Sequence, residues 1–141
     1  MLVIDASVAV KFVSNEAGRS EALSYCGGES QLIAPDWIRI EVSHSLWRKA
    51  GMGLISQEQA INGSDMLPSF LDAFLPAAEL LASGQKLAFE LSHGIYDCLY
   101  LALAIRENCG VLTADRKFWN AAKRAGCGDT VELLEWEGQR E

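Results

Sequence analysis

Short apolar segments alternate with longer amphipathic segments along this chain. The apolar segments are bounded by glycine, proline or polar residues, and they predict strands at residues 2–5, 31–34, 73–75, 110–113 and 130–134. The intervening segments carry apolar residues at helical spacing, and they predict helices at residues 6–15, 18–25, 35–50, 64–71, 77–91, 96–107 and 115–125. This alternation is typical of a mostly parallel sheet that is covered by helices on both faces.

Two local patterns refine this outline. Ser56 and Gln59 have the spacing of a capping box, which predicts that another helix starts there. The pair Asn62–Gly63 is expected to end that helix, because both residues favour turns. The helix predicted at 96–107 is apolar nearly all round, so we expect it to be buried at the centre of the domain.

Composition fits one globular domain, since the chain has 141 residues, of which 50% are apolar and 22% charged. We assign residues 1–135 to this domain and residues 136–141 to a polar C-terminal tail. The chain runs straight from MLVID into structure, so we expect no signal peptide. No apolar run reaches the roughly 18 residues of a membrane span, so we expect no membrane association. The four cysteines show neither zinc nor redox spacing, and we expect them to be reduced in a cytoplasmic protein.

Acidic residues occupy positions where α/β proteins bind ligands. Asp5 ends the first predicted strand, and Asp115 follows the fourth predicted strand by one residue. Ligands bind beyond the carboxyl ends of parallel strands, where the strand order reverses, so these two side chains lie together if their strands are neighbours. Glu41 lies in a mixed helix and Asp97 at the start of the apolar one, where a carboxylate is costly without compensation. Four such acids favour a hard divalent cation, Mg²⁺ or Mn²⁺.

Each acid also has a purely structural interpretation. Asp5, Asp97 and Asp115 stand at helix starts, where aspartate commonly caps the helix. Glu41 taken alone is typical of a solvated helix residue. The pattern by itself therefore predicts an α/β domain with a candidate acidic site and leaves the chemistry open.

The net charge of −7 counts against nonspecific nucleic-acid binding. Basic residues cluster at predicted helix ends, where they are either solvated partners of the helix dipole or contacts for a phosphate backbone. These residues are Arg48, Lys49, Arg116, Lys117, Lys123 and Arg124.

Other candidate residues favour structure over chemistry. His44 and His93 have no evident cysteine or serine partner, so we interpret both as structural. Trp37 and Trp47 are explained better by core packing or a dimer contact than by base stacking. The chain has no GxGxxG, GxxxxGK[ST] or GxSxG pattern, which excludes the common nucleotide-binding loops and the nucleophile elbow.

Four segments together resemble the PIN-domain ribonucleases, and in particular the VapC-type toxins of toxin–antitoxin pairs. They are VIDASVAVKF, APDWIRIEVSHSLWRK, YDCLYLALA and VLTADRKF, in that order between about residues 2 and 134. The resemblance implies a three-layer α/β/α sandwich whose five-stranded parallel sheet has the order 3-2-1-4-5. This sequence departs from the family pattern at one position. Family members commonly have an asparagine three residues after the second acid, and His44 stands there in this chain.

The resemblance also implies a site and an activity. The acidic site residues, which would bind Mg²⁺ or Mn²⁺ and serve catalysis, are Asp5, Glu41, Asp97 and Asp115. Small hydroxyl residues near the metal are Ser7 and Thr113. The implied activity is metal-dependent hydrolysis of RNA phosphodiester bonds by an endoribonuclease, with tRNA or rRNA as example substrates. The implied partners are a small VapB-like antitoxin and a second copy of the chain in a homodimer.

Two further hypotheses come from other classes of function. The domain could be a non-catalytic RNA- or protein-binding module that keeps the PIN-like fold. A magnesium-dependent phosphatase is disfavoured, because DAS at residues 5–7 lacks a second aspartate two positions after the first.

Overall fold

A computed structural model of the chain describes residues 1–139. A five-stranded sheet forms its middle layer, all of its strand pairs are parallel, and the strand order is β3-β2-β1-β4-β5. The strands are β1 (Leu2–Ile4), β2 (Leu32–Pro35), β3 (Ala73–Leu75), β4 (Gly110–Thr113) and β5 (Val131–Leu133). Both the predicted strand order and the predicted architecture are confirmed.

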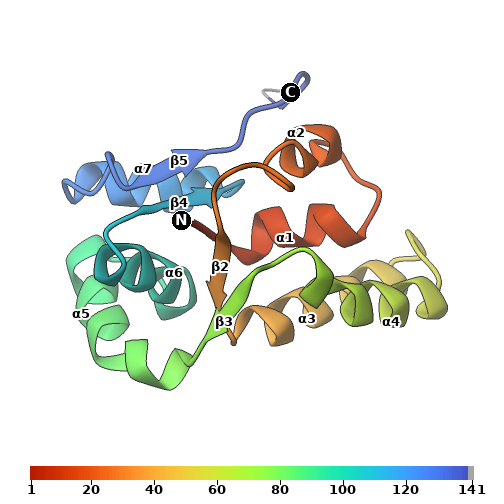
Figure 1. The fold of residues 1–141 in the computed structure, drawn as a ribbon, viewed down its shortest axis with the longest axis horizontal. Coiled ribbons are helices and arrows are strands. Elements are labelled where there is room, and N and C mark those ends of the chain that lie inside the picture. The colour runs from red at the N-terminus through yellow and green to blue at the C-terminus, as the bar shows by residue number, and fades with distance from the viewer. Residues whose placement is uncertain (140–141) are drawn as a thin grey trace.

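Helices cover the two faces of this sheet (Figure 1). On one side lie α1 (Ala6–Val13), α2 (Arg19–Leu23), α3 (Ile38–Gly51) and α4 (Gln57–Met66). On the other side lie α5 (Leu81–Leu91), α6 (Ile95–Arg106) and α7 (Arg116–Arg124). Short 3₁₀ turns at Leu67–Ser69 and Ala77–Leu80 flank β3. Seven consecutive residues of α6, Cys98 to Ala104, are buried, so this helix is the central one that its composition predicts.

Two boundary predictions were wrong. The helix expected to open at Pro35 begins at Ile38, because Pro35 is the last residue of β2. Asn62–Gly63 does not end a helix, because α4 continues through both residues to Met66, and the helix expected at 64–71 is reduced to the end of α4 and a 3₁₀ turn. Gly63 is buried, and a Cβ added there would lie 3.0 Å from the Leu46 side chain and 3.1 Å from the Val13 carbonyl oxygen. The glycine therefore serves close helix packing and not a turn. The predicted capping box of Ser56 and Gln59 is present at the start of α4.

The expected polar tail at 136–141 falls partly outside the described residues, which end at 139. Within the described part, Trp136 packs against the core, and the Lys11 ammonium lies 4.3 Å from its ring centroid. All four cysteines are free. No helix in residues 1–139 is long and apolar enough to cross a membrane.

Candidate metal centre

The carboxyl ends of β1 and β4 define the site. These strands are neighbours in register, with Ile4 opposite Leu112, and the Asp5 amide donates to the Leu112 carbonyl at 3.2 Å. Asp5 and Asp115 leave the two strands at the same edge of the sheet, at the point where the strand order reverses. Their expected proximity therefore has its basis in the sheet topology.

Asp5 is the most enclosed of the acids, with 1% of its surface exposed. Its Oδ1 accepts hydrogen bonds from Ser7 Oγ at 2.6 Å and from the Val8 amide at 3.2 Å, so it also caps α1. Burial raises the pKa of this carboxyl to about 7, and the negative charge of Asp97 adds to the rise. Asp5 is thus both a helix cap and a carboxyl whose ionised form is disfavoured by burial.

Ser7 and Thr113 connect the two strand ends. Ser7 Oγ lies 3.4 Å from Thr113 Oγ1 and accepts a hydrogen bond from the Ala114 amide at 2.8 Å. Thr113 is fully buried, and its hydroxyl accepts from the Asp115 amide at 3.0 Å. The hydroxyls therefore fix the turns that carry Asp5 and Asp115.

Glu41 reaches the site from α3 and is held by a residue that the sequence did not single out. The hydroxyl of Tyr100 on α6 donates to Glu41 Oε1 at 2.8 Å, and Tyr100 is fully buried. Burial raises the pKa of Glu41 to about 7, with a further contribution from the charge of Asp97. Burial and the charges of Glu41, Asp5 and Asp97 also raise the pKa of the Tyr100 phenol far above its usual range. The tyrosine therefore stays protonated and remains a donor.

Asp97 lies in the first turn of α6 beside a histidine. His93 Nε2 and Asp97 Oδ2 are 2.6 Å apart, and Asp115 offers an oxygen nearby. One ligand atom from each of His93, Asp97 and Asp115 lies within 4.8 Å of the other two. From the sequence His93 was interpreted as structural, and the structure adds that it lies beside Asp97 among possible metal ligands. Its spacing of four residues from Asp97, at a helix start, was the available signal.

Asp115 caps α7, as its structural interpretation proposed. Its Oδ1 accepts from the amides of Lys117 at 2.9 Å and Phe118 at 3.4 Å. The cap does not remove it from the site, because the carboxylate also contributes to the group with His93 and Asp97. One residue therefore serves both roles.

Mutual repulsion connects the four acids. The pKa of Asp97 is raised, first by burial and then by the charge of Asp115, while its bond to His93 works in the opposite direction. Asp97 in turn raises the pKa values of Asp5 and Glu41. Asp5 and Glu41 stand outside the group that shares ligand atoms within 4.8 Å, so the structure gathers two of the four predicted acids most tightly.

No lysine or arginine of the described residues forms an ion pair with these acids. In residues 1–139 the ion pairs of lysine and arginine join Lys11 and Lys49 to Glu16, and Arg106 to Glu79. Among the described residues, the basic partner of these acids is His93, beside Asp97. The other carboxylates fit a hard divalent cation, whose charge would offset the repulsion. The chemistry of the oxygen donors and the unmatched charge at the site agree with a metal centre.

The basic residues at helix ends have separate roles. Lys49 pairs with Glu16, and Lys123 lies 3.4 Å from the ring centroid of Trp119. Arg116 and Lys117 follow Asp115 directly and are exposed at the start of α7. Both lie within two residues of Asp115 in the sequence.

The tryptophans do not share one environment. Trp37 is partly buried and stacks on Tyr96, with ring centroids 5.5 Å apart and ring planes 3° from parallel. Trp47 is 67% exposed and stacks on His44, the residue at the family's asparagine position. Core packing therefore explains Trp37 in part and does not explain Trp47.

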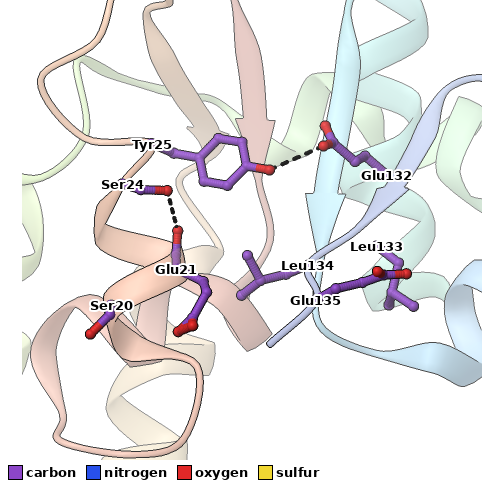
Figure 2. A pocket seen from close by; sticks show the side chains of 8 residues that line it. All are labelled: Ser20, Glu21, Ser24, Tyr25, Glu132, Leu133, Leu134 and Glu135. Atoms are coloured by element: carbon purple, nitrogen blue, oxygen red, sulfur yellow. Dashed lines mark hydrogen bonds between the residues drawn. The ribbon is translucent and has the colours of Figure 1, made fainter. Parts of the chain in front are cut away.

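A concave surface elsewhere is also acidic (Figure 2). It lies between α2 and β5, and the Tyr25 hydroxyl donates there to Glu132 at 3.0 Å. Glu21, Glu132 and Glu135 line it. Within the described chain, the group of close ligand atoms is found at His93, Asp97 and Asp115 and not here, so we place the candidate centre at the strand ends.

Comparison with known proteins agrees with this fold. A family model for the PIN domain matches residues 2–124. The chain therefore belongs to the PIN-domain family.

The chain is similar in sequence to individual proteins named as ribonucleases, and similar in structure to one crystal structure. The chain is 33% identical over 120 residues to Ribonuclease VapC3 of Pyrobaculum aerophilum, which covers 82% of this chain and 90% of the relative. It is 32% identical over 117 residues to Ribonuclease VapC1 of Mycobacterium tuberculosis, with 82% and 86% covered. The crystal structure of PAE2754 from Pyrobaculum aerophilum superposes with a TM-score of 0.65 at 19% identity, covering 94% of this chain and 83% of that one. The last likeness shows a shared fold.

Proposed function

We propose that this chain is a metal-dependent endoribonuclease that hydrolyses RNA phosphodiester bonds, and that it is the toxin of a VapBC-type toxin–antitoxin pair. The observation that carries the proposal is the group of acids at the reversal point of the sheet, one of them buried and three partly buried, which no lysine or arginine within residues 1–139 neutralises. Membership of the PIN-domain family and relatives named ribonucleases support the same activity.

The residues that would hold the cation are Asp5, Glu41, Asp97 and Asp115. What Mg²⁺ or Mn²⁺ supplies in such a site is activation of water and neutralisation of phosphate charge. Ser7 and Thr113 would act through the acids, because their hydroxyls fix the turns that present Asp5 and Asp115.

The protein's own groups set the geometry and the charge. Ser7 Oγ and the Val8 amide hold Asp5 in one orientation, and the Tyr100 hydroxyl holds Glu41. Because the pKa values of Asp5 and Glu41 are raised to about 7, both groups are poised to lose protons when a cation arrives.

Substrate contacts are proposed at the start of α7. Arg116 and Lys117 are exposed and adjacent to Asp115, so they are placed to meet phosphates that flank the reacting one. This local positive charge offsets the unfavourable net charge of −7 close to the site. The proposal includes RNA in the cytoplasm, such as tRNA or rRNA, as the substrate.

A VapB-like antitoxin and a homodimer complete the proposal. The names of the relatives support the antitoxin. Exposed apolar side chains support contacts with other chains: Trp47 and Ile61, which are 67% and 63% exposed, line a groove between α3 and α4.

Cleavage of a small-RNA pool by the purified chain tests the activity. We expect cleavage products with Mg²⁺ or Mn²⁺ that are absent with chelator and absent from Asp5→Asn and Asp97→Asn. Asp65→Asn, which changes an exposed carboxylate on α4, is the matched control and should cleave like the parent. RNA that is bound with Mn²⁺ present and never cut would favour the binding-module hypothesis and contradict the enzyme.

A further inference from the structure

Among the described residues, His93 is the one that brings a possible nitrogen ligand for a metal to the acids. Its Nε2 lies 2.6 Å from Asp97 Oδ2, and it shares with Asp97 and Asp115 a group of ligand atoms that lie within 4.8 Å of one another. The side chain is 18% exposed, so it faces the site from a largely enclosed position. The chain has two histidines, and the other, His44, is exposed on α3.

The position of the His93 ring is fixed by its surroundings. Its face stacks on Phe118 of α7, with ring centroids 5.5 Å apart. Its backbone amide donates to the Ala88 carbonyl at 3.1 Å, which ties it to the end of α5. Ser92, just before it, adopts a left-handed conformation with φ 51°, an uncommon state for a residue with a side chain. The short connection between α5 and α6 therefore presents the imidazole in a defined direction.

We propose that His93 Nε2 is a direct nitrogen ligand of the divalent cation at this site, beside the oxygens of Asp97 and Asp115, and that it biases the site toward transition-metal ions over Mg²⁺. This inference rests on the proposed metal-dependent function and deepens it. Imidazole suits first-row transition metals, whereas Mg²⁺ prefers oxygen ligands and water. A site of carboxylates alone lacks that source of discrimination.

In the competing explanation, His93 has an orienting role and is not a metal ligand. In that case the imidazole only orients Asp97 through the hydrogen bond and never contacts the ion. Loss of an orienting group lowers affinity for every ion by a similar factor, since all of them use the same carboxylate. Loss of a nitrogen ligand lowers affinity mainly for the ions that favour nitrogen. The ratio of two affinities therefore separates the two roles.

The experiment uses the full chain at pH 8 without RNA. Mg²⁺, Mn²⁺ and Co²⁺ are each titrated into the parent, His93→Gln and His44→Gln. Glutamine can retain a hydrogen bond to Asp97 while it removes the imidazole. We expect His93→Gln to lower the ratio of Co²⁺ to Mg²⁺ affinity by about tenfold or more, and His44→Gln to leave it unchanged. An equal loss for both ions, or no loss for either, overturns the proposal.

Pulsed electron paramagnetic resonance of bound Mn²⁺ gives a second, direct measurement. The parent and His44→Gln should show coupling to a histidine ¹⁴N nucleus, and His93→Gln should not. Unfolding curves in chelator check that His93→Gln is folded. If that variant is unfolded, the parent protein is measured with ordinary histidine and with ¹⁵N-labelled histidine. The label shifts the nitrogen frequencies if a histidine binds the Mn²⁺, and it leaves the spectrum unchanged if the ring is distant from the ion.

Failure of this inference and failure of the proposed function have different signatures. Nitrogen coupling in a chain that cuts no RNA supports the His93 ligand and contradicts the ribonuclease. Metal-dependent cleavage without nitrogen coupling supports the ribonuclease and contradicts the His93 ligand.

Discussion

Asp5→Asn should make the metal-free protein more stable at neutral and alkaline pH, although it removes an acid from the proposed centre. The pKa of Asp5 rises from an ordinary value of 3.8 to about 7, mainly because the carboxyl is buried. Each pH unit corresponds to about 1.4 kcal/mol, so holding this group ionised costs the folded state about 4 kcal/mol. With 1% of Asp5 exposed, solvent screening reduces this cost little.

The sign of the pH dependence follows from the direction of the shift. A carboxyl whose pKa is raised on folding contributes stability that is fully present below its unfolded value of 3.8 and is lost as pH rises through about 7. Asparagine does not titrate. The stability difference, Asp5→Asn minus parent, should therefore increase by about 4 kcal/mol between pH 4 and pH 8. Comparing two pH values cancels the cost of packing the amide beside Ser7.

The assay is denaturant unfolding in chelator at pH 4 and pH 8, with Asp65→Asn as an exposed control that should show no comparable increase. Adding Mn²⁺ at pH 8 should stabilise the parent and leave Asp5→Asn unchanged, because binding to the folded state alone adds stability. A stability difference between Asp5→Asn and the parent that does not change with pH would refute the argument that Asp5 is an uncompensated buried acid.

Three further predictions concern the surroundings of the acids. Tyr100→Phe removes the donor to Glu41 and should lower the free energy of unfolding at pH 8 by roughly 1–3 kcal/mol, measured with guanidinium chloride; an unchanged midpoint would contradict it. Gly63→Leu should destabilise the protein by about 1–3 kcal/mol in the same assay, because a Cβ added there would lie 3.0 Å from the Leu46 side chain. Equal or greater stability would show that α3 and α4 can separate. Mn²⁺ affinity should rise from pH 5 to pH 8, because the pKa values of Asp5 and Glu41 are about 7 and both groups release protons when the ion binds. Calorimetry in two buffers that differ in ionisation enthalpy measures this proton release. An affinity that is independent of pH would contradict the raised pKa values.

Periodicity predicted most of the fold because the helices and strands have distinct patterns. The buried strand Gly110–Thr113 and the nearly all-apolar helix around Leu101 were both predicted within a residue or so at each end. Gly63 misled the prediction, since a glycine in a helix marks either a stop or a close contact, and only tertiary packing decides between them. The strand order came from the family resemblance and not from the residues alone.

The site was predicted in part for a similar reason. Asp5 and Asp115 follow from strand ends, which a sequence shows directly. Tyr100 lies in an apolar helix, where nothing in the sequence separates a tyrosine that packs from one that donates to Glu41 across 59 positions. His93 contacts Asp97 within one helical turn, so its role was accessible from spacing, but a lone histidine is common in folded cores and gave no reason to choose it.

In the proposed reaction, water that is activated at this acidic centre cleaves the RNA. The most direct measurement uses one defined RNA that the chain cuts, made with and without a 2′-hydroxyl at the cut nucleotide, and incubated with Mn²⁺ or with chelator. We expect that both RNAs are cut with Mn²⁺, that neither is cut with chelator, and that Asp97→Asn cuts neither. Cleavage that persists in chelator and requires the 2′-hydroxyl would contradict it, because the RNA itself would then supply the nucleophile.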